Sequence, residues 1–98
     1  QSINVALLTL SGVDQPIPEN DVLKSSMQLL KDTILENLRR ADVVSAFSSI
    51  QFVLMLPSTT YENAQMICHR IIDKFIEKDP SKQVKIVANV RPLKPVDL

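Results

Sequence analysis

The sequence predicts an α+β domain in which two helices cover one face of a four-stranded antiparallel sheet. Four runs have the length and the aliphatic or alternating composition of β-strands. Two longer segments repeat their apolar residues at spacings of three and four, as amphipathic helices do. These segments follow one another in the order strand, helix, strand, strand, helix, strand. We therefore expect a small sandwich of one sheet and one helical layer.

Composition limits the size and the partners of this domain. The chain has 98 residues, with 11 Lys or Arg against 11 Asp or Glu, so its formal net charge is zero. Residues 1–98 are enough for one hydrophobic core and too few for two. Without a basic surplus there is no long-range attraction to phosphate backbones or anionic lipid, so direct nucleic-acid and membrane partners are not expected. A single cysteine and the lack of any signal peptide or membrane span indicate a cytoplasmic protein.

The first strand and first helix occupy the N-terminal half. Ile3–Leu10 is a continuous apolar run, which is typical of a strand covered on both faces. Ser11–Asn20 contains the only glycine and two of the six prolines, so it is expected to be a loop. The helix is expected at Asp21–Arg40, with Arg39 and Arg40 at its end, where cations complement the helix dipole. Its predicted apolar stripe consists of Leu23, Met27, Leu30, Ile34, Leu35 and Leu38.

A hairpin follows the first helix. Val43–Phe47 is expected to be an edge strand, and Ser48 with Ser49 begins a tight connection. The run Gln51–Leu56 is strongly apolar and is stopped by Pro57, so we expect it to be a central strand. The tip of the hairpin is the natural place for chemistry, because a sheet holds such exposed residues in position.

The C-terminal part contains the second helix and the last strand. Thr59 and Glu62 have the spacing of a capping box, so the helix is expected to begin near Thr60 and to end at Asp79-Pro80. Its predicted buried stripe consists of Ala64, Ile67, Cys68, Ile71, Ile72, Phe75 and Ile76. The last strand is expected at Gln83 to Val90 or Arg91. Its basic residues suit a sheet edge, since charges there discourage pairing with other chains.

With right-handed crossovers this element order gives the ferredoxin-like βαββαβ sandwich, with the first and third strands in the centre. Two helices can cover only one face of the sheet, yet both faces of the two central strands are apolar. Phe52, on the third strand, is expected to be buried. The other sheet face would expose an apolar patch, so we expect a homodimer partner or further chain to cover it. The chain begins at Gln1 rather than Met, which indicates a fragment of a longer protein.

Several kinds of site are not supported by the residues. Cys68 and His69 are neighbours on one helix, about 100° apart around its axis, and the sequence has no other Cys or His to complete a metal site or a nucleophile pair. Gly12 is the only glycine, so no phosphate-binding glycine loop can be drawn. The strands carry only Phe47 and Phe52 as aromatic platforms, and RNA recognition is therefore not expected.

The region from residue 39 to residue 57 resembles the signature of the GGDEF family, the diguanylate cyclases. That signature is RxxD, five residues, then GGDEF at a hairpin and an aliphatic strand ending in proline. Arg39 and Asp42 match RxxD, and Phe47 matches the aromatic residue before the two glycines. Phe52 matches the last residue of the motif, and Val53–Pro57 matches the strand. The resemblance implies a nucleotide-cyclase scaffold.

The departures from the family decide what the resemblance implies about activity. The hairpin replaces the family's two glycines, its Asp and its Glu with Ser48, Ser49, Ile50 and Gln51. On the first strand, Thr9 and Ser11 stand where the family carries aspartates that hold Mg²⁺. Phosphoryl transfer needs metal ions that neutralise charge on the phosphates, and carboxylates hold Mg²⁺. We therefore expect no catalytic residues, no metal and no cofactor.

A closer resemblance is to the GGDEF-like C-terminal module of SARP-type or BTAD-containing bacterial transcriptional activators. It rests on the amino-acid sequences of three segments, Leu38–Val44, Ser48–Pro57 and Thr60–Met66. The resemblance implies a non-catalytic sensory or dimerisation module, with a DNA-binding domain and a helical activator domain in the same chain. The alternative is a receptor for a small ligand, which would be cyclic di-GMP held by Arg39 and Asp42, or another metabolite against the sheet. Arg39 and Asp42 could instead simply end the helix and fix the turn that follows.

Overall fold

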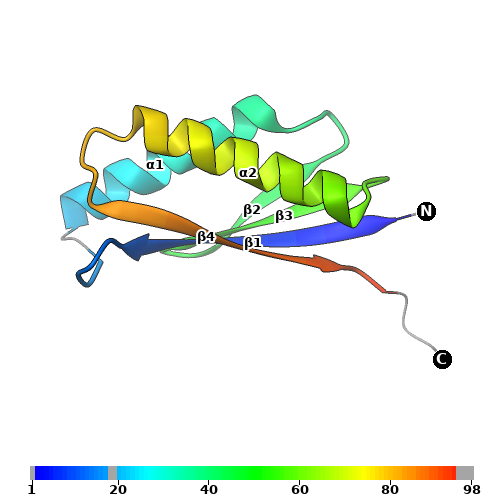
Figure 1. The fold of residues 1–98 in the computed structure, drawn as a ribbon, viewed down its shortest axis with the longest axis horizontal. Coiled ribbons are helices and arrows are strands. Elements are labelled where there is room, and N and C mark those ends of the chain that lie inside the picture. The colour runs from blue at the N-terminus through cyan, green and yellow to red at the C-terminus, as the bar shows by residue number, and fades with distance from the viewer. Residues whose placement is uncertain (1, 18–19, 95–98) are drawn as a thin grey trace.

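The computed structural model describes residues 2–17 and 20–94. Their sheet has the order β2-β3-β1-β4, and all neighbouring strands are antiparallel. Both helices lie on one side of the sheet (Figure 1). The predicted fold class and the predicted central strands are therefore confirmed. The elements are β1 (Ile3–Gly12), α1 (Asn20–Asn37), β2 (Val43–Ser48), β3 (Gln51–Pro57), α2 (Tyr61–Lys78) and β4 (Val84–Pro92).

Strand β1 organises the sheet because it pairs with β3 on one edge and with β4 on the other. Leu8, in its middle, lies opposite Phe52 of β3 and Ala88 of β4. Alternate residues of β1 are buried beneath the helices, and the residues between them are half-buried. The core lies between the sheet and the two helices, and consists of Ala6, Leu8, Leu10, Leu30, Ile34, Phe52, Leu54, Leu56, Ala64, Ile67, Cys68, Ile71, Phe75, Val84, Ile86 and Val90.

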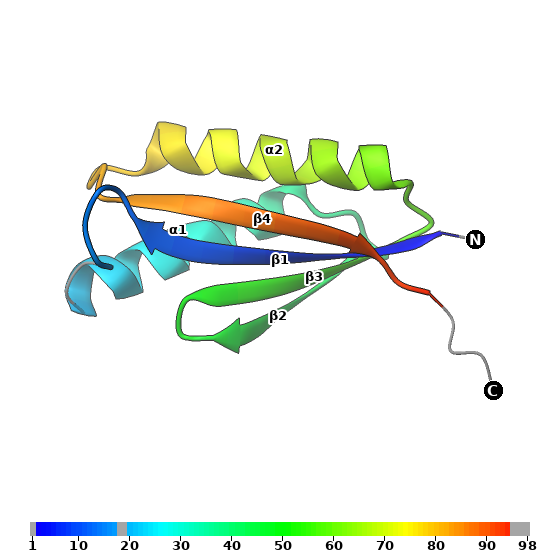
Figure 2. The same cartoon turned by 60° about the horizontal axis from the view of Figure 1, so that its bottom comes forward.

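The face of the sheet opposite the helices, which we call the open face, is not covered by any described element (Figure 2). Val5 and Leu7 of β1 and Val53 of β3 are half-buried there. Met55 is 44% exposed, and Val43 at the β2 edge is 57% exposed. The register places Met55 between Val5 and Val43, so these side chains form one continuous apolar patch. The first strand is thus not covered on both faces within the described chain.

Helix α1 ends at Asn37, three residues before the predicted end at Arg40. The chain turns instead, because the Arg39 N–H donates to Asp42 Oδ2 at 2.8 Å and the Asp42 N–H donates to the Arg39 carbonyl at 3.0 Å. Asn37 Nδ2 satisfies the carbonyl of Thr33 at 2.7 Å, which caps the last turn. The prediction that Arg39 and Arg40 complete the helix is therefore wrong, since local side-chain bonds outcompete another turn.

The cap of α2 is one residue later than predicted. Thr60 is the N-cap, and its hydroxyl accepts a hydrogen bond from the Asn63 N–H at 3.2 Å. Thr59 is buried and has a different role, described below. Two predicted core positions are also wrong, because Leu35 is 52% exposed and Ile76 is 48% exposed. Both lie at the margins of their apolar stripes, where the sheet does not reach.

The remaining boundaries differ from the predictions by one or two residues. Strand β1 continues to Gly12, where a side chain would lie 2.1 Å from the Gln15 carbonyl oxygen. Part of the predicted loop, residues 18–19, lies outside the described residues. Cys68 is fully buried, as predicted, and its burial raises the pKa of its thiol to about 11. This cysteine is a core residue rather than a nucleophile.

Candidate functional site

The hairpin tip brings together three of the residues that occupy the signature positions. Thr9 and Gln51 are opposite each other in the β1–β3 register. Gln51 Nε2 donates to Thr9 Oγ1 at 3.2 Å, and Ser48 Oγ donates to Gln51 Oε1 at 2.8 Å. The tip therefore carries a chain of neutral hydrogen bonds from β1 to the bulged end of β2.

The side chains of the other signature residues do not belong to this chain of hydrogen bonds. Ile50 is tied in by its backbone, since its carbonyl accepts from the Leu10 N–H at 2.8 Å, and its side chain packs against the core. Ser11, two residues after Thr9 on the same face of β1, lies opposite Lys85 of β4 and beyond the last residue of β1 that pairs with β3. Ser49 lines a groove beside α1, and Phe52 is buried under the helices, as predicted. The Ile50 and Phe52 side chains are therefore part of the apolar packing and present no polar group at the hairpin tip.

This donor set does not fit Mg²⁺. Magnesium binds through one or two carboxylates together with water and substrate phosphates. Thr9, Ser11 and Gln51 offer hydroxyl and amide groups, and Ile50 offers no donor in its side chain. Within residues 2–17 and 20–94, no three His, Cys, Asp or Glu side chains gather as a metal site would require. The residues at these positions therefore do not supply the carboxylates that a magnesium site needs.

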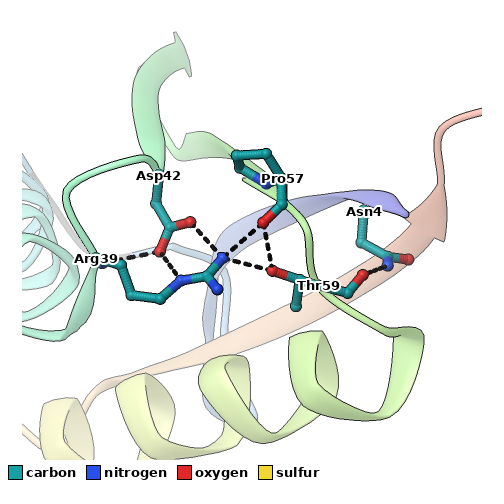
Figure 3. Close-up of polar contacts among 5 residues, drawn as sticks. All are labelled: Asn4, Arg39, Asp42, Pro57 and Thr59. Carbon is teal, nitrogen blue, oxygen red and sulfur yellow. Dashed lines mark hydrogen bonds and ion pairs between the residues drawn. The ribbon is translucent and has the colours of Figure 1, made fainter. Parts of the chain in front are cut away.

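Arg39 and Asp42 form a compact clasp between two loops (Figure 3). Arg39 Nε donates to Asp42 Oδ2 at 3.0 Å, and Arg39 Nη2 donates to Asp42 Oδ1 at 2.7 Å. The same Nη2 donates to the Pro57 carbonyl at 2.9 Å and makes a short hydrogen bond to Thr59 Oγ1. The clasp thereby joins the α1–β2 loop to the β3–α2 loop.

The Asp42 carboxylate is committed to this clasp. Its side chain has no exposed surface, whereas that of Arg39 is 48% exposed. Burial alone would raise the pKa of Asp42, but hydrogen bonds from the Arg39 side chain and backbone, together with the Arg39 charge, outweigh burial and lower it. Both oxygens accept from Arg39, so the carboxylate is held ionised by a partner in its own chain.

The clasp continues inward to Asn4. Asn4 Nδ2 donates to the Thr59 carbonyl at 2.6 Å, as Figure 3 shows. Asn4 is buried, and its Oδ1 atom has no hydrogen-bond partner among the described residues. Thr59 is therefore held from two sides, by Arg39 at its hydroxyl and by Asn4 at its carbonyl. This explains why Thr59 does not serve as the helix cap.

A groove that the sequence did not indicate runs between α1 and β2. Its floor is apolar and its α1 side carries Lys24 and Lys31. The one signal in the sequence was the seven-residue spacing of these lysines, which places them on one side of a helix. The groove is lined by Asn20, Leu23, Lys24, Met27, Gln28, Lys31, Val44, Ser45, Ala46, Ser49 and Phe52. We call it the β2 groove.

Solved structures resemble this fold although no family model and no curated protein matches the sequence. The diguanylate cyclase SiaD of Pseudomonas aeruginosa, solved with its activator SiaC, is 16% identical with a TM-score of 0.71. The active GGEEF domain of a diguanylate cyclase from Vibrio cholerae is 15% identical with a TM-score of 0.73. The chain has a GGDEF-like fold.

The match is unequal in length. The SiaD match covers 100% of this chain and 40% of that one, and the Vibrio match covers 97% and 65%. This chain thus spans less than two thirds of either structure. At these identities the likeness concerns the fold. Among the described residues, no helix is both long and apolar enough to cross a membrane.

Proposed function

We propose that this chain is a non-catalytic regulatory module with a GGDEF-like fold. It acts by associating with another protein chain. The observation that carries the proposal is the neutral hydrogen-bond chain of Ser48, Gln51 and Thr9 at the hairpin tip. A module that turned over GTP would need carboxylates to bind the metal ions there. The open face offers a different use for the scaffold, because contiguous exposed apolar surface marks interaction sites.

The absence of cyclase activity is directly testable. Purified protein incubated with GTP and Mg²⁺ is expected to form no cyclic di-GMP, because Thr9 and Gln51 present no charge to a metal ion. Product formation is followed by chromatography, with an active diguanylate cyclase assayed in parallel. Turnover above the level of a buffer blank would contradict the proposal.

The occupant proposed for the open face is a second copy of the module. Two antiparallel sheets pack well face to face when their inner faces are apolar. Val53 is at the centre of this surface, opposite Leu7 of β1 and Ser45 of β2. The setting proposed for such a dimer is a cytoplasmic transcription regulator of the SARP or BTAD type, in which DNA-binding and helical activator domains share the chain. The resemblance of residues Ser48–Pro57 to that family supports this setting.

Sedimentation velocity tests the dimer. The wild type is expected to be dimeric at micromolar concentration, and Val53→Lys is expected to weaken the dimer by about tenfold or more, because the two-fold axis brings like charges together in an apolar interface. Met66→Lys is the matched control, since Met66 is 67% exposed on α2, on the opposite side of the molecule. A wild-type monomer, or a dimer that survives Val53→Lys, would rule out this interface.

The second candidate, a cyclic di-GMP receptor, stays a prediction that rests on the RxxD resemblance. A ligand held by Arg39 and Asp42 would have to displace the bonds between them, because each Asp42 oxygen already accepts from Arg39. The geometry therefore favours the structural role for this pair. Calorimetric titration with cyclic di-GMP, repeated on Arg39→Lys, separates the two hypotheses. Heat in the wild type that the variant loses would favour the receptor.

A further inference from the structure

The two edges of the sheet differ in how well they are protected against pairing with a strand of another chain. The β4 edge carries Lys85 and Arg91 and ends at Pro92, and such residues discourage pairing with another strand. The β2 edge has no charged residue and no proline in its six residues. Its Val43 and Phe47 are 57% and 66% exposed. Strand β2 pairs only with β3, so the backbone groups on its outer side have no strand partner among the described residues.

The β2 groove runs along this unprotected edge. Val44 lies opposite Leu54, and Ala46 lies opposite Phe52, so both face the helical side of the sheet. Yet Val44 is only half-buried and Ala46 is exposed, because α1 does not extend over β2. A strand added beside β2 would place alternate side chains in the space that α1 leaves open.

The charge on this groove has one sign. Lys24 and Lys31 are both exposed and line it from α1, about 10 Å apart at 1.5 Å of rise per residue. No acidic side chain is among the described residues that line it. The chain as a whole is neutral, so this is a local cationic rim above an apolar floor. Such a rim favours carboxylate groups on whatever lies in the groove.

We propose that the β2 edge and the β2 groove together bind an extended acidic peptide segment of another protein as an additional strand. The peptide backbone pairs with the outer edge of β2 at Val43–Ala46, since the bulge after Ala46 ends regular pairing. Side chains on one face of the peptide lie in the groove, where their carboxylates meet Lys24 and Lys31. Those on the other face lie beside Val43 and Phe47.

The same charges argue against a second copy at this edge. Two β2 strands related by a two-fold axis would place both α1 helices on the same side of a continuous sheet. Lys24 and Lys31 of each copy would then face their counterparts across the groove, which costs free energy. This surface shares Val43 with the open face, but the β2 groove lies on the helical side of the sheet, so a dimer centred on Val53 would leave the groove accessible.

A designed peptide tests this chemistry on the intact chain. The probe is a fluorescein-labelled octapeptide of four Glu-Val repeats, which presents glutamates on one face and valines on the other when extended. Fluorescence anisotropy is expected to show saturable binding that weakens as salt is raised. The matching Lys-Val octapeptide is expected not to bind.

Variants separate charge from backbone pairing. Lys24→Glu with Lys31→Glu is expected to weaken binding of the Glu-Val probe by about tenfold or more. Lys74→Glu with Lys85→Glu makes the same change in net charge away from the groove and is expected to leave binding unchanged. Two further probes carry N-methyl groups on all the glutamates or on all the valines. Only the set of N–H groups that faces β2 matters in a strand, so one of these probes is expected to lose binding and the other to keep it.

Four results would overturn the proposal. The first is no binding of the Glu-Val probe, and the second is equal binding of the Lys-Val probe. The third is equal affinity for both N-methylated probes, which would exclude edge pairing. The last is loss of binding in Val53→Lys together with unchanged binding in the Lys24→Glu and Lys31→Glu double variant. That result would show that the peptide binds the open face instead.

Discussion

Replacing Phe52 with alanine is expected to lower the free energy of unfolding by about 3–5 kcal/mol, because a buried aromatic side chain leaves both lost contacts and a cavity. Phe52 is 6% exposed and lies opposite Leu8 of β1, at the centre of the core. A loss of this size approaches the whole stability of a small domain. Urea denaturation followed by far-ultraviolet circular dichroism measures it.

Phe47 supplies the matched control for this substitution. It is the same residue type on the same hairpin, but its side chain is 66% exposed. Phe47→Ala is expected to change the unfolding free energy by no more than about 0.5 kcal/mol. Equal effects of the two substitutions would mean that the helical layer does not cover β3 as described.

The second large effect is expected at Arg39. Arg39→Ala should lower the unfolding free energy by about 1–3 kcal/mol at neutral pH, since it leaves the buried Asp42 carboxylate without its side-chain donor. It also removes the bonds to Pro57 and Thr59 that join the two loops. Arg40→Ala, at the exposed neighbouring position, is expected to have little effect.

The Arg39 effect is expected to depend on pH. In the wild type the folded-state pKa of Asp42 is lowered, so its contribution is present above the ordinary carboxylate pKa and is lost as the pH falls through the folded value. Without Arg39, burial remains and should raise that pKa, which favours the protonated acid. The stability difference between wild type and Arg39→Ala should therefore shrink between pH 7 and pH 3. If the difference in unfolding free energy stayed constant over this pH range, the Asp42 carboxylate would not be the source of the Arg39 effect.

Most of the fold follows from patterns of apolar residues. The short continuous apolar run of β3 and the spacing of Ile67, Ile71 and Phe75 in α2 correctly separate strand from helix, and the element order then leaves one common topology. Errors occur at margins, as at Leu35, where a wide apolar stripe extends beyond the surface that the sheet covers. Burial at such a position depends on where the neighbouring element of structure ends. The spacing of apolar residues along a helix does not predict that.

The candidate sites are harder to predict from the sequence than the fold is. That Thr9 and Gln51 bear no charge is visible in the residues, but the hydrogen bond between them depends on the β1–β3 register. The sequence pattern predicts Arg39 at a helix end, whereas its partners Pro57 and Thr59 are 18 and 20 residues away. The spacing of Lys24 and Lys31 does not by itself predict the β2 groove, because the groove arises from the position of α1 relative to β2. Contacts distant in sequence decide each of these features.

The pairing of β4 with β1 has a consequence for how the protein is made. These are the last and first of the described strands, and their register places Asn4 opposite Pro92. On the ribosome, β1 emerges before β4, so this domain has an unpaired apolar strand edge until β4 has been made. Pairing with β4 then covers this edge of β1, and the β2 edge remains the unprotected edge of the finished sheet.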